Sequence, residues 1–567
     1  MFYISYYTHQ LAVKNKNQIG ALLLFLLFWI GNVTAQESPK IIEIIQAGGS
    51  TQDQFSFPGA NILLKKEGVR VHLFHEGALI KSDISYFYHK KNFFRANGDV
   101  VFMQGDTLKM TCQQIEYNGN TKLAKAWGKV VLERPDMNLF TDTLYIDREK
   151  SEAFYNSLGT IIDEQRKLTS IRGTYFMNEK KYRFISSVKI DDPEYELRSQ
   201  RLDYFTDNDR AFFYGKTTIV GEDYDIYCEK GAYDTKLQKG NFQKNAIILY
   251  DNKEIKGDSL YFENEKDYAA ATNNVSIVDT LNKSIINGHY GEIFKAKDSA
   301  IITRRAVAIN IIDQDSLYIH ADTLLATGPQ EEKILRGYYD VRIFKSDIRG
   351  KSDSIHLNQN TGLIKMLKLP LTRKEIQIFT ESQKSARNPV LWFGKNQMSG
   401  DEIFLTSNME TRKLDSLKII GNSWVIEKDS ISGTGFNQIK GGLLDGVFQD
   451  GKLHEIYVSK NTQVIYYMYS DEDNELIGID NTTCSRLKMI TENNQIEDIT
   501  FFVSPDGNLF PDKDLPINDR KLEGFVWRSK ERPKIIEDLF SVEDNQFQPK
   551  ETKESITPEA FKKFEPQ

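Results

Sequence analysis

The sequence predicts an all-β protein made mostly of antiparallel strand pairs that stack along the chain. Aromatic residues make up 12% of the 567 residues, with 27 Tyr and 34 Phe, and these types suit a pleated, half-buried surface. A strand-like pattern recurs about every 29 residues, which is typical of a repeat architecture. Between residues 80 and 320 no helical period of 3.6 residues is sustained.

The first element is a targeting segment over residues 1–35, which we predict to be a signal peptide. Two lysines precede an apolar run of about 15 residues, Ile19 to Val33, which ends in the small-x-small pattern Val33-Thr34-Ala35. A retained anchor is the alternative, but a spanning helix needs about 20 apolar residues. We therefore expect an exported chain that begins near Gln36.

A three-residue pattern, apolar or Gly, then any residue, then aromatic or aliphatic, marks one strand of each repeat. The third residues of successive copies lie 28 to 31 positions apart. The nine copies are Ile84-Ser85-Tyr86, Ile115-Glu116-Tyr117, Leu144-Tyr145-Ile146, Gly173-Thr174-Tyr175, Leu202-Asp203-Tyr204, Gly231-Ala232-Tyr233, Leu260-Tyr261-Phe262, Gly288-His289-Tyr290 and Leu317-Tyr318-Ile319.

A second pattern, a small or polar residue followed by an apolar run, marks the other strand. It occurs as Gly98-Asp99-Val100-Val101-Phe102, Gly128-Lys129-Val130-Val131-Leu132, Gly159-Thr160-Ile161-Ile162, Asn245-Ala246-Ile247-Ile248-Leu249 and Asn274-Val275-Ser276-Ile277-Val278. Many of the three-residue copies follow an Asp, as at Asp142, Asp258 and Asp353. We expect these short acceptor side chains to cap turns between the strands.

The repeat pattern divides the chain after the signal peptide into three parts. Residues 36–325 are predicted to form one β-repeat domain, and residues 326–504 a second, less regular β domain. From residue 505 to 567 the chain is rich in Pro and charge, so we expect an extended or partly disordered tail.

Side chains at positions i and i+2 of a strand share a face, so the patterns predict one inward row. Its members are Tyr86, Val100, Phe102, Ile115, Tyr117, Val130, Leu132, Leu144, Ile146, Tyr175, Leu202, Tyr204, Tyr233, Leu260, Phe262 and Tyr290. The row is either ordinary core or the wall of a groove for lipid chains, in which each buried methylene contributes about 0.8 kcal/mol. Periodicity alone does not separate the two.

The alternation of two strand motifs resembles the OstA/LptA-like lipopolysaccharide-transport family. The motifs are Ala126-Trp127-Gly128-Lys129-Val130-Val131-Leu132 and Asp142-Thr143-Leu144-Tyr145-Ile146-Asp147. The resemblance implies a V-shaped or twisted antiparallel β-jelly roll that shields lipid A acyl chains in the periplasm and pairs edge to edge with other transport proteins. The chain is longer than the simple bridge protein of that family, and nothing after residue 504 resembles a long series of amphipathic membrane strands.

No pattern of residues indicates catalysis or a cofactor. His72 and His75 fall on opposite faces of a strand, and the motifs of P-loop enzymes, serine hydrolases and zinc proteases do not occur. Cys112, Cys228 and Cys484 are scattered, without metal or redox spacing. The formal charge of −7 and the lack of a basic run argue against a nucleic-acid partner.

The sequence therefore predicts a non-enzymatic periplasmic protein that binds lipopolysaccharide and assists its transport to the outer membrane. Its expected partners are lipid A and other transport proteins, and self-association through the same edges stays open. One rival is a structural or adhesive cell-surface β-solenoid with a solid core. The other is a carbohydrate-active β-helix enzyme, which requires a single cluster of carboxylates.

Overall fold

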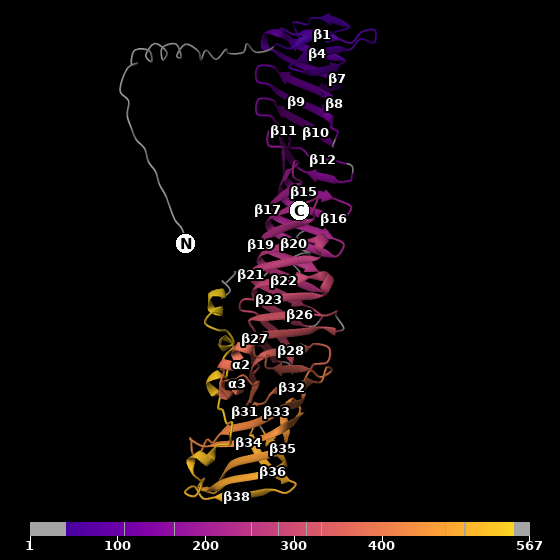
Figure 1. Cartoon of the computed structure of the whole chain (residues 1–567). Coiled ribbons are helices and arrows are strands. Elements are labelled where there is room, and N and C mark those ends of the chain that lie inside the picture. The colour runs from indigo at the N-terminus through magenta and orange to yellow at the C-terminus, as the bar shows by residue number, and fades with distance from the viewer. Residues whose placement is uncertain are drawn as a thin grey trace, which may run out of the picture. The chain divides into compact units, whose positions relative to one another are not determined.

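The protein is an antiparallel β structure throughout, as predicted (Figure 1). The computed structural model describes residues 41–548 except 107, 136, 164, 251, 282, 313–314, 330–331, 471 and 493–494. The signal peptide predicted over residues 1–35 lies outside that range. Within the described residues, no helix combines the length and the apolar character needed to span a bilayer.

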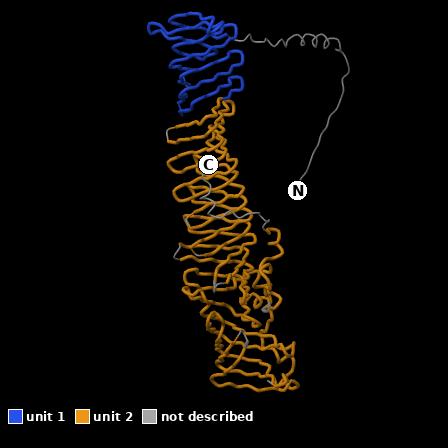
Figure 2. The backbone as a smooth tube through the Cα atoms, turned by 180° about the vertical axis from the view of Figure 1, so that it is seen from behind, with its two compact units in different colours: residues 1–152 blue, residues 153–567 orange. Residues whose placement is uncertain are grey.

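The chain forms two compact units, residues 1–152 and 153–567 (Figure 2). In unit 1 the strands β7 to β10 pair in chain order, and the shorter strands β1 to β6 precede them. The elements of unit 1 are β1 (Glu43–Gln46), β2 (Gly49–Thr51), β3 (Asn61–Leu64), β4 (Val71–His75), β5 (Ala78–Ser82), β6 (Ile84–Tyr88), η1 (His89–Lys91), β7 (Phe93–Gln104), β8 (Leu108–Asn118), β9 (Leu123–Glu133) and β10 (Asn138–Asp147).

In unit 2 each of the strands β16 to β21 pairs along its length with the strands before and after it. The early strands are β11 (Glu152–Tyr155), which begins at the division, β12 (Gly159–Ile162), β13 (Lys167–Ser170), β14 (Arg172–Phe176), β15 (Lys181–Asp191), β16 (Tyr195–Phe205), β17 (Arg210–Gly221), β18 (Tyr224–Asp234), β19 (Lys239–Tyr250), β20 (Lys253–Glu263), η2 (Asn264–Lys266), β21 (Tyr268–Asp279), β22 (Ser284–Phe294) and η3 (Lys295–Lys297).

The later part of unit 2 continues the same pairing with several strands split in two. Its elements are β23 (Ser299–Thr303), β24 (Val307–Ile312), β25 (Asp315–His320), β26 (Thr323–Thr327), β27 (Ile334–Phe344), β28 (Ile348–Asn358), β29 (Ile364–Leu367), α2 (Arg373–Ile378), α3 (Glu381–Ala386), β30 (Val390–Phe393), β31 (Asn396–Ser399), β32 (Glu402–Ser407), β33 (Leu414–Lys428), β34 (Phe436–Gln449), β35 (Lys452–Tyr469), β36 (Leu476–Glu492), β37 (Gln495–Phe502) and β38 (Asp506–Phe510).

Every second long strand is bent at its middle by residues with left-handed backbone angles. In β9 these are Gly128 and Lys129, with φ of 80° and 52°, and in β21 they are Asn273 and Asn274, with φ of 57° and 50°. The strand pairing shifts register at the same points. The small or polar residues of the second sequence motif are therefore bend residues, because Gly and Asn tolerate this conformation best.

Several recurring polar residues of the neighbouring strands face these bends. Asn274 donates from Nδ2 to Asp258 at 2.9 Å, and the backbone N–H of Lys216 donates to Gln200 at 3.3 Å. Asp142 and Asp353 also lie inside strands, β10 and β28. Asp315, another of these recurring acceptors, does bind a turn, because the backbone N–H of Ser346 between β27 and β28 donates to it at 3.0 Å. The predicted turn capping is therefore right for Asp315, whereas Asp258 serves a bend.

The bends fold each strand stack into two layers whose inner faces meet. Tyr195 at the start of β16 and Tyr233 near the end of β18 have ring centroids 5.8 Å apart. On a flat sheet these opposite ends would be about 30 Å apart, at ~3.3 Å per residue. Layer A contains the first halves of strands β8, β16, β18, β20 and β22. Layer B contains the second halves of the same strands.

One apolar core runs through unit 2 from Phe184 to Met489, between the two layers. The boundary predicted near residue 325 has no counterpart in this core, because Leu317, Leu324 and Leu335 all belong to it. The chain instead divides between Glu152 and Ala153. Split strands, not a new domain, explain why the repeat loosens after residue 325.

The C-terminal segment that the sequence predicts as an extended or partly disordered tail begins with a paired strand, β38. After it, residues 511–548 run back along the outside of unit 2, and we call this segment the strap (Figure 1, yellow). It holds four short turns, η5 (Ile517–Arg520), η6 (Ser529–Glu531), η7 (Ile536–Leu539) and η8 (Asp544–Phe547). Sequence composition did not reveal this docking, because the partners are scattered over strands far away in the chain.

Gly173 makes room for a buried ring. A Cβ added there would lie 2.4 Å from Cζ of Tyr155, whose side chain is 4% exposed and whose hydroxyl contacts Ser170 Oγ at 2.7 Å. We expect Gly173→Ala to destabilise unit 2 by about 1–3 kcal/mol through overpacking, measured by urea unfolding. In a Tyr155→Ala background the same change should cost little. An equal loss in both backgrounds would contradict this account.

Acid should loosen the strap. Burial alone would raise the pKa of Glu531, but hydrogen bonds from Arg528 and Lys351 outweigh it and bring the pKa to about 2. A lowered pKa stabilises the docked state above the free value, and this contribution is lost as the pH falls from 4.5 toward 2. Limited pepsin digestion should cut the strap increasingly over this range. Glu531→Gln should weaken that dependence, and an unchanged profile would refute the assignment.

Candidate functional site

The candidate site is the interior between the two layers and the edge at which it reaches the surface. The turns at the strand ends of layer A face those of layer B along this edge, which we call the seam. In unit 1, Tyr117 OH at the end of β8 lies 3.0 Å from Nδ1 of His75 at the end of β4. Arg148 bonds both to Tyr117 OH at 3.3 Å and to the carbonyl of Glu76 at 3.2 Å, so it ties the two layers together.

In unit 2 aromatic rings close the first part of the seam. Tyr195 contacts Tyr233, and Tyr224 contacts Phe262 with ring centroids 4.7 Å apart. Each pair joins a residue of layer A to one of layer B. Burial raises the pKa of the hydroxyls of Tyr195, Tyr224 and Tyr233, so these rings stay neutral at ordinary pH. The closure is therefore apolar and carries no charge of its own.

Further along the seam, small and aliphatic residues lie among the aromatic rings, and cavities appear. One of about 50 Å³ has an apolar floor formed by Ile277, Ile286, Ile293, Ala300, Ala326 and Leu335. Lys253, Lys295 and Asp298 stand at its rim. A neighbouring cavity of about 30 Å³ has Tyr224 and Lys295 among its lining residues. Another, of about 270 Å³, has Leu281 and Arg412 among its lining residues. The seam here is amphipathic, with apolar walls below a charged edge.

The rim is held by polar contacts between the two layers. Lys295, in a turn of layer B, donates to Asp223 of layer A at 3.1 Å and has its ammonium 4.6 Å from the ring centre of Tyr250. Burial disfavours the charged form of Lys295, but Asp223 outweighs it and the pKa is raised. Gln238 of layer B likewise bonds to Glu194 of layer A. These contacts are few and solvent-exposed, so the rim is weaker than the bend.

The interior itself is closely packed in this structure. A single buried water needs about 10–15 Å³ of such cavity space, so the two smaller cavities have room for only a few waters. The side chains of Leu202, Phe213 and Leu260 beneath the seam are fully buried. A hydrocarbon chain can enter only if the two layers move apart at the seam.

Twelve residues of the predicted inward row are buried between the layers: Val100, Phe102, Ile115, Tyr117, Val130, Leu132, Leu144, Ile146, Leu202, Tyr233, Leu260 and Phe262. Tyr175 and Tyr204 are half-buried near the edge of the interior, where Tyr175 stacks on Tyr182 at 4.4 Å. Tyr204 donates from its hydroxyl to Asp209 at 2.8 Å. Their role toward a ligand stays a prediction.

Two members of the row lie on the outer face. Tyr86 packs against Phe57, while Phe87 beside it is buried at 2% exposure. The step from Tyr86 to Tyr117 is 31 residues, two more than the usual 29, and a change of two residues keeps the face, so the spacing did not reveal the position of Tyr86. Tyr290 bonds to Glu292 outside, and Ile293 is buried instead. The step from Phe262 to Tyr290 is 28 residues, one fewer than 29, and a change of one residue reverses the face.

The sequence patterns missed the inner aromatic residues of the other strands. Phe94, Phe184, Phe213 and Phe242 are at most 2% exposed and form much of the core beside the predicted row. They lie before the bends of β7, β15, β17 and β19, and the second motif begins only at the bend. His75 is buried and paired with Tyr117. Among the described residues, no group of three or more His, Cys, Asp or Glu side chains is placed to hold a metal ion.

Comparison with known proteins gives one family model and several distant solved structures. No curated protein matches the chain. A solved structure, the periplasmic component LptH of the lipopolysaccharide transport device from Pseudomonas aeruginosa, is 13% identical, covers 17% of this chain and 74% of its own, and has a TM-score of 0.16. A likeness this low carries no argument. Residues 42–200 match the family model described as OstA-like protein. This segment is therefore OstA-like, as the strand motifs of the sequence indicate.

Proposed function

We propose that the protein is a non-enzymatic, periplasmic lipopolysaccharide-binding protein that shields lipid A acyl chains between its layers and assists transport to the outer membrane. One observation carries the proposal: a continuous apolar interior reaches the surface along a seam with a charged rim. Such a seam fits a ligand with hydrocarbon chains and a polar head. The match of residues 42–200 to OstA-like proteins supports the same function.

The energetics favour apolar chains over a polar ligand. Each methylene transferred from water to the interior contributes about 0.8 kcal/mol, so several acyl chains bind strongly without any catalytic group. The packed interior sets the opposing cost, because contacts such as Tyr224–Phe262 must separate first. Binding is therefore expected to be coupled to an opening of the seam.

The head group is proposed to stay at the rim. Lys253 and Lys295 stand beside the cavity whose floor includes Ile286 and Ala300. An ammonium group at the rim attracts the phosphates of lipid A while the acyl chains extend into the interior. Charge at the rim then contributes more to capture and orientation than to affinity.

Partners are proposed to join at the ends of the strand stacks. The last strands, β37 and β38, each pair with β36 in the described residues, and Val503 and Leu509 beside them are 66% and 48% exposed. Edge strands with unpaired backbone groups favour pairing with another chain. Other transport proteins are the proposed partners, and a second copy would use the same edges.

A structural or adhesive role is the second candidate, because the closed, packed interior is also what a solid β-solenoid requires. The two functions differ in one respect. A structural protein never exposes its interior to lipid, whereas a transport protein does so in each cycle of binding.

Photo-crosslinking from adjacent residues of β20 separates the two. Phe262 points inward at 8% exposure, and Tyr261 points outward and bonds to Glu263 at 2.8 Å. A photoreactive residue at 262 should capture lipopolysaccharide in living cells, while the same residue at 261 should capture little. Capture at neither position, with both variants folded, would favour the structural role.

Neutralising a rim lysine should weaken binding modestly. We expect Lys253→Gln to raise the dissociation constant for lipopolysaccharide about two- to fivefold at low salt, since an exposed ion pair is worth about 0.2–1 kcal/mol. The effect should shrink as salt is added. Lys230→Gln is the matched control, because Lys230 is exposed and pairs with Tyr214 beside the bend of β17, away from the seam. Equal effects of the two changes would exclude Lys253 as a contact.

A further inference from the structure

The strap follows the part of unit 2 in which the seam has cavities. Its bonds reach from Gln438 in β34, through Gln397 in β31, to Arg305 between β23 and β24. The cavities of the seam span residues of β18 to β32 and the turn after β32. They open at the turns, whereas the strap contacts bend residues and outward side chains. A separate cavity of about 760 Å³ is lined by Trp424 and by the strap residues Glu523 and Arg528.

The far end of the strap completes a bend. Arg305 has a left-handed φ of 61°, and its backbone N–H donates to Oδ1 of Asp544 at 3.0 Å. At the bend of β17 the equivalent acceptor, Gln200, comes from the neighbouring strand. At Arg305 it comes from the strap, so this bend depends on a segment more than 200 residues away in the chain.

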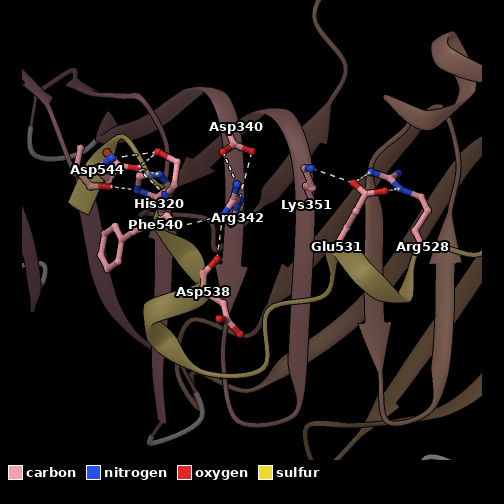
Figure 3. Close-up of polar contacts among 11 residues, drawn as sticks. His320, Asp340, Arg342, Lys351, Arg528, Glu531, Asp538, Phe540 and Asp544 are labelled. Carbon is pink, nitrogen blue, oxygen red and sulfur yellow. Dashed lines mark hydrogen bonds and ion pairs between the residues drawn. The ribbon is translucent and has the colours of Figure 1, made fainter. Parts of the chain in front are cut away.

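Asp544 is itself held firmly in place (Figure 3). Its Oδ2 accepts from the N–H and hydroxyl of Ser541 at 2.9 and 2.8 Å, and it lies 3.4 Å from Nε2 of His320, which is fully buried. The ring of Phe540 packs 3.6 Å from the guanidinium carbon of Arg305 and 5.1 Å from the ring of His320.

Two further anchors lie along the strap. Arg342, oriented by the bend residue Asp340 at 2.7 Å, donates to the backbone carbonyl of Asp538 at 2.9 Å. Glu531 accepts from Lys351 at 2.9 Å and pairs with Arg528, whose side chain also donates to the carbonyl of Asn388 at 2.6 Å. Figure 3 shows Arg342 and Lys351 on the paired strands β27 and β28, with Glu531 and Arg528 on the strap.

We propose that the strap is a releasable splint along the bends, which limits how far the two layers can separate at the seam. The layers are joined covalently only through the bends, so any opening of the seam must change the bend angle. A strap bonded to Arg305, Arg342 and Asn388 resists that change in β23 to β30. Release of the strap then lets the seam open. The statement that an open seam admits a lipid rests on the proposed function, whereas the mechanical role of the strap does not.

A distance across the seam tests the splint without any ligand. Spin labels are placed on Asn252→Cys and Lys297→Cys, two exposed turn residues of layers A and B. The three native thiols are buried, and burial raises the pKa of Cys112 and Cys228 to about 12, so they react slowly. Asp544→Ala removes the far anchor, and Glu543→Ala changes the exposed neighbouring acid as a control.

We expect Asp544→Ala to speed amide hydrogen exchange in residues 536–548 about tenfold or more, as loss of a charged hydrogen bond implies. The same variant should shift the label distance to longer values, and Glu543→Ala should change neither. Faster exchange with an unchanged distance would overturn the proposal. A chain truncated after Phe510 lacks the strap altogether, and an unchanged distance there would also overturn it.

Dodecyl phosphate, added last, separates the splint from the proposed function. If strap release opens the seam and this probe binds faster, both inferences stand. If the seam opens and the probe binds neither form, the lipid-binding function fails while the splint remains. If the probe binds at equal rates with and without the strap, and the distance is unchanged, the splint fails alone.

Discussion

The structure depends on the bend that interrupts every second long strand. Two successive residues with positive φ, such as Gly128 with Lys129 or Asn273 with Asn274, are costly for most side chains, and Gly and Asn reduce that cost. Acceptors on the next strand, such as Asp258, bind these residues and stabilise the corner. Without the bends the strands would form a single open sheet with one apolar face in water.

Folding each sheet onto itself creates an interior with two unequal borders. At the bends the layers are joined by the backbone of the long strands that pass from one layer to the other, whereas at the seam only side chains such as Tyr224, Phe262 and Lys295 connect them. The weaker border is where the interior can be reached. This asymmetry is why the seam, and not the bend, is the candidate site of a lipid-binding function.

The strap adds stiffness to the stronger border. Asp544 supplies to Arg305 the acceptor that another bend receives from its own sheet, and Glu531 fixes the strap between Lys351 and Arg528. A carboxylate held in this way keeps a lowered pKa, which ties its docking to its charged state. The strap is therefore an integral part of the border at which the strands bend.

The sequence by itself determined the fold class, the period of about 29 residues and most members of one inward-facing row. Twelve buried positions, among them Leu202 and Phe262, follow from alternation along strands, which is a local property. Tertiary structure decided the face of Tyr86, whereas the 28-residue step to Tyr290 already contained a shift of one residue. It also decided that acceptors such as Asp258 serve bends, that the core continues past residue 325 and that the strap docks. These features depend on contacts between distant residues, which no local pattern records.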